Sequence, residues 1–497
     1  MSRLGAAVVV GLALLGLVVA GELAPVPAEV PGAPRAVPVV GTEVVCPDVR
    51  QVAPVLRTRV SAGIVPGPAG AGTAQAQALS GDTPPVPLAL TAPGQVAAGL
   101  AQELDGDALL VRATGAFAPG LQVEQVTRGT SGTQRGLAAL RCEAARPDTW
   151  WVGGATTVGD SAVLLLANPD DTPAVVDVEV LTASGRVDGR PGRGVAVGPR
   201  SRTAVPLDRL APDREWLAVH VRAVRGRVAG SLRHVRADGR SPRGVDWVPP
   251  AGEPTAQAVV PGLPAGPGRR VVVVANPGPD DTVVALTLAT ADGVVSPPDL
   301  QALAVPAGTT VAQDVSALVP QTPAAVRVVS GAGPVLASAL VVDAQHTAAG
   351  RPVGRVRELA WTGAAEPLRG PALVTDVVLD RPTESTLLLS ALDGDAKVRV
   401  TPVEVTGTDD ALPEGRAVEV PAGRTVPLRL STFLPPGASG RLAVEVRPLP
   451  GSGPVHAARY LRERGEDGPL SNVLVLRGAA APVLRPQAVP DLRAATG

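Results

Sequence analysis

The side chains best able to transfer protons at neutral pH are the four histidines. Their positions do not match between the internal repeats described below: His220, His234, His346 and His456. A histidine base needs a nucleophile beside it. The nearest approach to a hydrolase serine motif is Gly159-Asp160-Ser161, but it continues into a predicted strand, and no G-x-S-x-G elbow occurs. No P-loop or dinucleotide-binding glycine motif occurs either, so we predict that the protein is not an enzyme and uses no cofactor.

Paired carboxylates follow an Asn-Pro step at the ends of two predicted strands, at Asp170-Asp171 and Asp280-Asp281. One interpretation is a cation-binding loop. The other is a tight turn, where Asn, Asp, Pro and Gly are favoured for their backbone geometry. A calcium loop needs six or more oxygen ligands in close series. We therefore favour the turn and predict no metal site.

The best candidate for a binding contact is the pair Trp150-Trp151. Exposed aromatic rings could stack on a sugar ring or on a side chain of a partner. The alternative is that one of the two rings fills a core between units, as Trp247 and Trp361 would. The chain holds only five Trp, two Phe and one Tyr, and this scarcity favours the core role.

Cys46 and Cys142 are the only cysteines. An even pair in an exported chain predicts a disulfide, and this one would close a loop of about 97 residues, contributing roughly 4–5 kcal/mol in the chain-entropy model. The alternative is two separate buried thiols. A zinc site is disfavoured because no second ligand stands at a suitable spacing.

Export itself is predicted from the N-terminal segment. Leu4 to Gly21 is uncharged, Arg3 precedes it, and Glu22 follows it. As a helix it would span roughly 27 Å, enough for a bilayer core, with the N-terminus in the cytoplasm and the remainder outside. We favour a transmembrane anchor in the cell membrane. The alternative is a signal peptide cleaved near Val18-Val19-Ala20, which would release a secreted protein.

Composition predicts the elements that carry these residues. Val, Ala and Leu dominate the apolar residues, and 56 Gly and 53 Pro punctuate the chain, which disfavours long helices and favours short strands. The net charge of −1 supplies no field for nucleic acid. Arginine greatly outnumbers the single Lys397, and we attribute this bias to a GC-rich genome.

Internal repetition is the strongest organising signal. LLLANPDD from Leu164 recurs as VVVANPGPDD from Val272, and a second block places equivalent valines at Val197, Val305 and Val420. A third block of strand, Gly-containing turn and return strand follows each time, which predicts a β-hairpin. A period of about 110 residues with many short strands favours tandem β-sandwich-like domains.

The fold class predicted is therefore all-β, with tandem β-sandwich-like domains after one N-terminal transmembrane or signal helix. The predicted segments are a signal anchor or signal peptide (1–21), a Pro/Ala-rich spacer (22–41), a divergent β unit with the disulfide (42–148), three β-sandwich units (149–248, 249–362 and 363–480) and a flexible tail (481–497).

The Val-Cys-Pro strand start at Val45-Cys46-Pro47, the Ala-Asn-Pro turns at Asn168 and Asn276, and the Val-Pro-Ala-Gly strands resemble a known family. These motifs are similar to those of actinobacterial envelope proteins of the domain-of-unknown-function family 5719, over most of the chain after residue 40. The resemblance implies a secreted or membrane-anchored protein of a high-GC Gram-positive envelope, and it assigns no functional residue.

Three functions remain open at this point. The first is a non-enzymatic extracytoplasmic scaffold or accessory protein that binds another envelope protein. The second is a cell-wall glycan-binding module that uses Trp150. The third is a hydrolase of unrecognised type. The partners predicted are the membrane, through the N-terminal helix, and another envelope protein or wall glycan, but no nucleic acid.

Overall fold

The computed structural model describes residues 35–47, 57–82, 84–99, 107–187, 190–346, 352–378, 383–406, 412, 414–433, 441–465, 468–479 and 483–485. The predicted helix (1–21), most of the predicted spacer (22–41) and most of the predicted tail (481–497) lie outside these residues. Where the structure describes the chain, it is all-β, with strands joined by turns and a few short 3-10 segments. No helix within these residues is long and apolar enough to cross a membrane.

The chain divides into two compact units. The smaller one comprises residues 1–38 and 481–497, and in it β1 (Arg35–Val37) pairs antiparallel with β36 (Val483–Arg485). The larger one, residues 39–480, contains all the other strands. These strands form four successive groups, which we call repeats one to four, and each repeat contributes strands to two sheets.

The strands of repeat one belong to two sheets. Its first sheet runs β2 (Gly41–Cys46), β7 (Leu109–Gly115), β4 (Gly72–Ala78) and β5 (Val86–Pro87). Its second sheet runs β6 (Gln95–Ala98), β3 (Arg57–Ile64), β8 (Leu121–Gly129) and β9 (Gly136–Arg141).

Repeat two follows the same order. Its first sheet runs β10 (Asp148–Val152), β16 (Ala218–Arg225), β12 (Ala174–Thr182) and β13 (Gly185–Val187), with β14 (Val195–Val197) also on β12. Its second sheet runs β15 (Ser201–Pro206), β11 (Asp160–Asn168), β17 (Ala229–Asp238) and β18 (Ser241–Val248).

Repeat three is equivalent. Its first sheet runs β19 (Gln257–Leu263), β25 (Ala324–Ser330), β21 (Thr282–Thr290) and β22 (Val294–Val295), with β23 (Leu303–Val305) also on β21. Its second sheet runs β24 (Thr310–Asp314), β20 (Gly268–Ala275), β26 (Leu336–His346) and β27 (Pro352–Gly363).

Repeat four completes the series. Its first sheet runs β28 (Ala372–Val378), β33 (Arg441–Pro448) and β30 (Ala396–Val405), with β31 (Arg416–Val420) also on β30. Its second sheet runs β32 (Arg424–Arg429), β29 (Thr383–Ala391), β34 (His456–Gly465) and β35 (Gly468–Val475). Parallel pairing of β30 with β6 joins repeat four to repeat one.

The hairpins predicted for the third block are wrong, although their strands are present. In repeat two, β16 pairs with β10 and β12, whereas β17 pairs with β11 and β18. The turn at Gly226 therefore carries the chain from one sheet to the other. A strand, a turn and a strand in the sequence do not distinguish a hairpin from such a crossing, because both need the same turn chemistry.

Burial patterns explain why the two sheets of a repeat differ in sequence. In β16 the buried Val219 and Val221 alternate with the less buried His220 and Arg222, as expected for a sheet with one covered face. In β20 every residue from Val271 to Ala275 is buried. A continuous apolar run of this kind requires cover on both faces.

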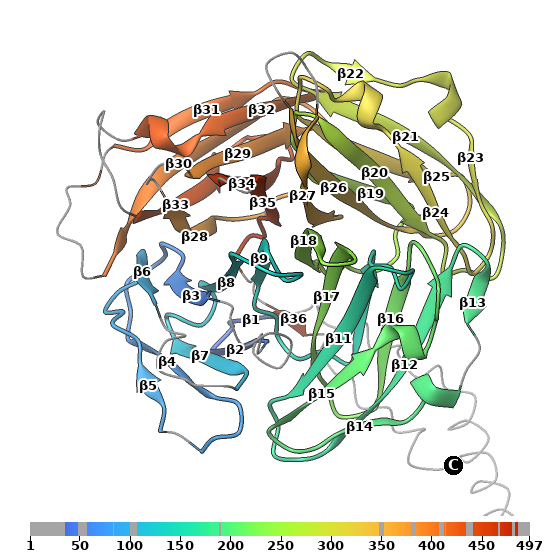
Figure 1. Cartoon of the computed structure of the whole chain (residues 1–497). Coiled ribbons are helices and arrows are strands. Elements are labelled where there is room, and N and C mark those ends of the chain that lie inside the picture. Colours follow the sequence, from blue (N-terminus) through green and yellow to red (C-terminus); the bar gives the residue numbers. More distant parts are fainter. Residues whose placement is uncertain are drawn as a thin grey trace, which may run out of the picture. The chain divides into compact units, whose positions relative to one another are not determined.

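That cover comes from the neighbouring repeat. Val272 and Val274 pack in the core of repeat three, whereas Val271 and Val273 pack in the core of repeat two. Similarly, Leu165 of β11 packs in the core of repeat one. The edge strands of the second sheets contact one another in a closed cycle, β9 with β18, β18 with β27, β27 with β35, and β35 with β9 (Figure 1).

Candidate functional site

A cleft with a volume of about 490 Å³ lies where repeats two and three meet. Its walls come from the turn before β11, from β17, the β17–β18 turn and β18, and from β20, β26 and β27. The charged side chains that line it are Asp160, Arg236, Asp238, Arg243, Arg269 and Arg357. Loops and strand ends on a rigid frame are where binding residues commonly lie.

The Asp160 carboxylate is held in place by hydrogen bonds from neighbouring side chains. Its Oδ1 accepts hydrogen bonds from His234 Nε2 at 2.9 Å and Arg236 Nε at 2.7 Å, and its Oδ2 accepts from Arg236 at 3.1 Å and from the Thr157 hydroxyl. Burial acts to raise the pKa of Asp160, but the hydrogen bonds from His234 and Arg236 outweigh it and hold that pKa far below its usual value. The carboxylate is therefore charged, and it orients Arg236.

Both ring nitrogens of His234 make hydrogen bonds. Its Nδ1 accepts a hydrogen bond from Trp361 Nε1 at 3.2 Å, so the proton of the neutral ring lies on Nε2 and points at Asp160. Burial lowers the pKa of His234. With both nitrogens engaged, His234 has no free nitrogen to accept a proton from Ser161, which is exposed and follows Asp160 in the sequence. The Gly159-Asp160-Ser161 segment thus supports a turn and an ion pair.

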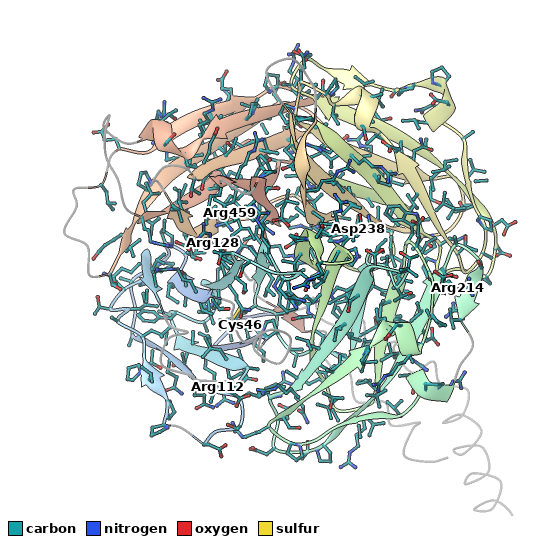
Figure 2. All side chains as sticks on the ribbon, in the orientation of Figure 1. Cys46, Arg112, Arg128, Arg214, Asp238 and Arg459 are labelled. Carbon is teal, nitrogen blue, oxygen red and sulfur yellow. A yellow bond between two sulfur atoms is a disulfide. The ribbon has the colours of Figure 1, made fainter. Side chains whose placement is uncertain are left out.

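The rim of the cleft carries three further arginines. Arg243 pairs with Asp238 at 2.7 Å, and Arg269 pairs with Asp314 at 3.2 Å. Arg357 is exposed. Figure 2 labels Asp238, at the end of β17. The rim therefore presents guanidinium groups whose ion pairs are near solvent, where such pairs are weak.

The turn before β11 is shaped by a glycine. Gly159 has a φ of +91°, and a Cβ there would lie 2.3 Å from the Ala237 carbonyl oxygen, so only glycine fits this wall. The preceding Val158 is fully exposed. An apolar side chain thus stands beside the charged cleft.

Trp150 and Trp151 are both buried, with exposed fractions of 7% and 1%. Trp150 stacks on His220 with ring centroids 3.9 Å apart, and His220 Nε2 lies 2.9 Å from Asp148. Trp151 packs in the core of repeat two against Gly230. Both rings therefore belong to the core cluster of repeat two.

Trp247 and Trp361 fill cores between repeats. Trp247 of repeat two packs in the core of repeat one, and Trp361 of repeat three packs in the core of repeat two. A cavity of about 40 Å³ lies among Trp151, Trp247 and Trp361. This volume has room for about one water molecule, so we do not regard it as a ligand site.

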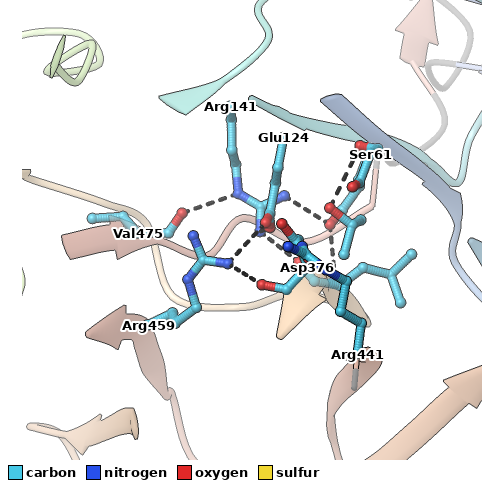
Figure 3. Close-up of polar contacts among 10 residues, drawn as sticks. Ser61, Glu124, Arg141, Asp376, Arg441, Arg459 and Val475 are labelled. Carbon is cyan, nitrogen blue, oxygen red and sulfur yellow. Dashed lines mark hydrogen bonds and ion pairs between the residues drawn. The ribbon is translucent and has the colours of Figure 1, made fainter. Parts of the chain in front are cut away.

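A buried polar network lies between repeats one and four (Figure 3). The two oxygens of Glu124 accept hydrogen bonds at 3.2 Å from Arg141 and from Arg459, respectively. Arg459 also donates to the Asp376 carbonyl at 2.8 Å, and Arg141 donates to the Val475 carbonyl at 3.1 Å. Removing one member would leave a buried charge uncompensated. We therefore infer that this network stabilises the contact between repeats one and four.

Two further acids lie at the contacts between β9, β18 and β27. Asp246 accepts hydrogen bonds from the Trp361 and Ala139 amides and from Asn472, and Glu358 accepts from the Val245 and Leu359 amides. Burial raises the pKa of both carboxyls, against these donors. Asp246 accepts hydrogen bonds from repeats one, three and four, and Glu358 accepts from repeats two and three, so both acids join repeats.

The repeated Ala-Asn-Pro segments are turns, as favoured from the sequence. Asn168 donates to the carbonyls of Thr172, Val197 and Gly198, and Asn276 donates equivalently to those of Asp280 and Val305.

The paired aspartates serve the same turns and their surroundings. Asp170 binds Arg227, Asp171 binds Arg200, and Asp281 accepts from the Ala307 amide. These carboxylates are therefore engaged by arginines and by the backbone.

The predicted disulfide between Cys46 and Cys142 is confirmed (Figure 2). Its Cα atoms lie 4.6 Å apart, and both residues are buried. Cys46 ends β2 in the first sheet and Cys142 follows β9 in the second, so the bond joins the two sheets of repeat one. Beside it, Val45 and Glu143 exchange two backbone hydrogen bonds.

Sequence reasoning missed the cleft. We attributed the excess of arginine to genome composition and did not consider the arginines as a site. The signal that could have found part of it is the dense RADGRSPR turn, which places Arg236, Arg240 and Arg243 within eight residues. Arg269 and Arg357 come from another repeat, and only the tertiary structure brings them to the same cleft.

Fold and site together define an all-β protein with a charged cleft at the junction of two repeats. The model of a family described as "Family of unknown function (DUF5719)" matches residues 96–412. The chain belongs to this family, which confirms the resemblance seen in its motifs. No curated protein matches the chain.

Proposed function

We propose that this protein is a non-enzymatic extracytoplasmic scaffold or accessory protein of the cell envelope, and that it binds another envelope protein. The observation that carries the proposal is the arginine-lined cleft at the junction of repeats two and three. Asp160 holds Arg236, and the interleaved cores hold the strands that carry the other arginines. Preorganised groups lose little freedom when a partner binds.

The location follows from the N-terminal segment, which we propose is an anchor in the cell membrane, with the rest of the chain outside. The disulfide supports this placement because such bonds persist in oxidising compartments. We further propose that each repeat is a β-sandwich-like domain, within the bounds 42–148, 149–248, 249–362 and 363–480.

A wall-glycan module at Trp150 is less supported, since that ring is stacked and buried. A hydrolase at Ser161 is less supported as well, because both nitrogens of the neighbouring His234 are engaged. Both remain outcomes that the following experiment can reveal.

The test is site-specific photo-cross-linking in cells, followed by mass spectrometry. The photoreactive amino acid replaces Val158, which is fully exposed at the cleft, and in a matched control it replaces Val224, which is 65% exposed in the same repeat and outside the cleft. We expect one recurrent envelope protein to be captured from position 158 and not from position 224. Capture of wall glycan alone, or of the same proteins from both positions, would refute the proposal.

A further inference from the structure

The charge of the cleft differs from that of the chain. Four arginines and two aspartates line it among the described residues, which leaves the lining two charges positive, whereas the whole chain has a net charge of −1. A concave surface with an excess of one sign of charge favours ligands of the opposite sign.

The four arginines are not equivalent. Arg236 is held by both oxygens of the buried Asp160, so it forms part of the frame. Arg269 is 51% exposed and makes a single ion pair at 3.2 Å with Asp314, which is itself 46% exposed. Arg357 is exposed. The two arginines from repeat three are thus the ones that can exchange solvent or a weak pair for a ligand.

The chemistry of the lining favours carboxylates of a protein segment. The planar guanidinium fork matches a carboxylate in two parallel hydrogen bonds, and a cleft of this volume is in the range that holds a small ligand or several side chains. The exposed Val158 adds an apolar contact. None of the described lining residues is aromatic, so the stacking platform typical of sugar recognition is missing there.

We propose that this cleft binds an acidic segment of the partner protein, in which carboxylates pair with Arg269 and Arg357 beside an apolar side chain that contacts Val158. This inference rests on the proposed function, because it names the chemistry by which that partner is recognised.

The test uses the full-length protein in detergent and a fluorescent peptide with four glutamates around one leucine, measured by fluorescence anisotropy. The comparison peptide carries glutamine in place of glutamate. The cleft variant is Arg269→Glu with Arg357→Glu. The matched control is Arg222→Glu with Arg429→Glu, two arginines that are 60% and 70% exposed outside the cleft.

We expect saturable binding of the glutamate peptide, weaker by at least about tenfold in the cleft variant and unchanged in the control variant. Binding should also weaken as salt rises, because exposed charges are screened. Equal binding by the cleft variant, or equal binding of the glutamine peptide, would overturn the inference. Arginine-dependent binding of a phosphate-bearing wall glycan, with none of the peptide, would overturn the assignment to a protein segment.

The cross-linking experiment separates the two proposals. If a partner is captured equally by the wild type and by the cleft variant, the scaffold function stands and the acidic-segment inference fails. If the acidic peptide binds through the cleft but no envelope protein is captured in cells, the cleft chemistry stands and the proposed function fails.

Discussion

Replacing Trp361 or Trp247 by phenylalanine tests whether single polar contacts contribute to the packing of the repeats. Both tryptophans are nearly fully buried, at 1% and 2%, and both fill the core of the preceding repeat. They differ in one contact. Trp361 Nε1 donates to His234 Nδ1 at 3.2 Å, whereas Trp247 Nε1 has no protein acceptor among the described residues.

The expected magnitudes follow from this difference. Each substitution removes a similar volume, so each should lower the free energy of unfolding by about 1–3 kcal/mol through lost packing. Trp361→Phe also leaves the buried His234 Nδ1 without a hydrogen-bond donor, which should lower the free energy of unfolding by about 1–3 kcal/mol more. Trp361→Phe should therefore be the more destabilising variant by about that second amount.

The assay is urea unfolding followed by far-UV circular dichroism, which reports on the sheets rather than on the substituted rings. Midpoints and slopes are compared between the wild type and the two variants, because a chain of this size need not unfold in one step. Equal losses for the two variants, or a larger loss for Trp247→Phe, would refute the reasoning about the His234 contact.

Three further outcomes are expected. Gly230→Ala should lower the free energy of unfolding by about 1–3 kcal/mol, because the new Cβ would lie 2.4 Å from Cη2 of the buried Trp151. Replacing Cys46 and Cys142 by alanine removes a disulfide between residues 96 positions apart. This double variant should have a free energy of unfolding lower by about 4–5 kcal/mol, measured by denaturant unfolding. Burial lowers the pKa of His456 to about 4 in the folded protein, whereas the unfolded chain has a histidine pKa of about 6.5. As the pH falls below about 6.5, the imidazole is therefore protonated in the unfolded chain before it is protonated in the folded protein. The free energy of unfolding should then decrease by up to about 3 kcal/mol by pH 4.

Each outcome has its control. Gly41→Ala adds a Cβ where nothing lies within 4 Å, so it should leave stability nearly unchanged, and an equal loss there would contradict the close contact at Gly230. Reductant should destabilise the wild type but not the double alanine variant. The difference in pH dependence between the wild type and His456→Gln isolates the histidine, and identical curves between pH 6.5 and pH 4 would contradict its lowered pKa.

Much of the fold could be predicted because it depends on short-range patterns. Alternation around Val219 and Val221 predicted a strand with one covered face, and burial shows that face. The Asn168 and Asn276 turns were predictable as well, because the asparagine side chain bonds the backbone of its own turn, as for Asn276 with Asp280. The pairing of strands was not, since β16 and β17 belong to different sheets.

The candidate site could not be predicted for the same reason. Asp160 and Ser161 drew attention as a possible serine motif, but the contacts that decide their role come from His234 and Arg236, more than seventy residues away. Trp150 drew attention as an exposed ring, and it is covered by His220 from another strand.

The sequence by itself determined an all-β chain and its turns, because residue propensities and turn chemistry suffice for these. Its short motifs indicated the family, and the presence of only two cysteines favoured the pairing of Cys46 with Cys142 over two separate thiols. Only the tertiary structure decided that the second sheet of one repeat covers the core of the preceding one, and that β9, β18, β27 and β35 meet in a closed cycle. It also decided that arginines of two repeats share one cleft. These features depend on contacts between residues up to hundreds of positions apart, and local pattern does not specify which apolar face meets which.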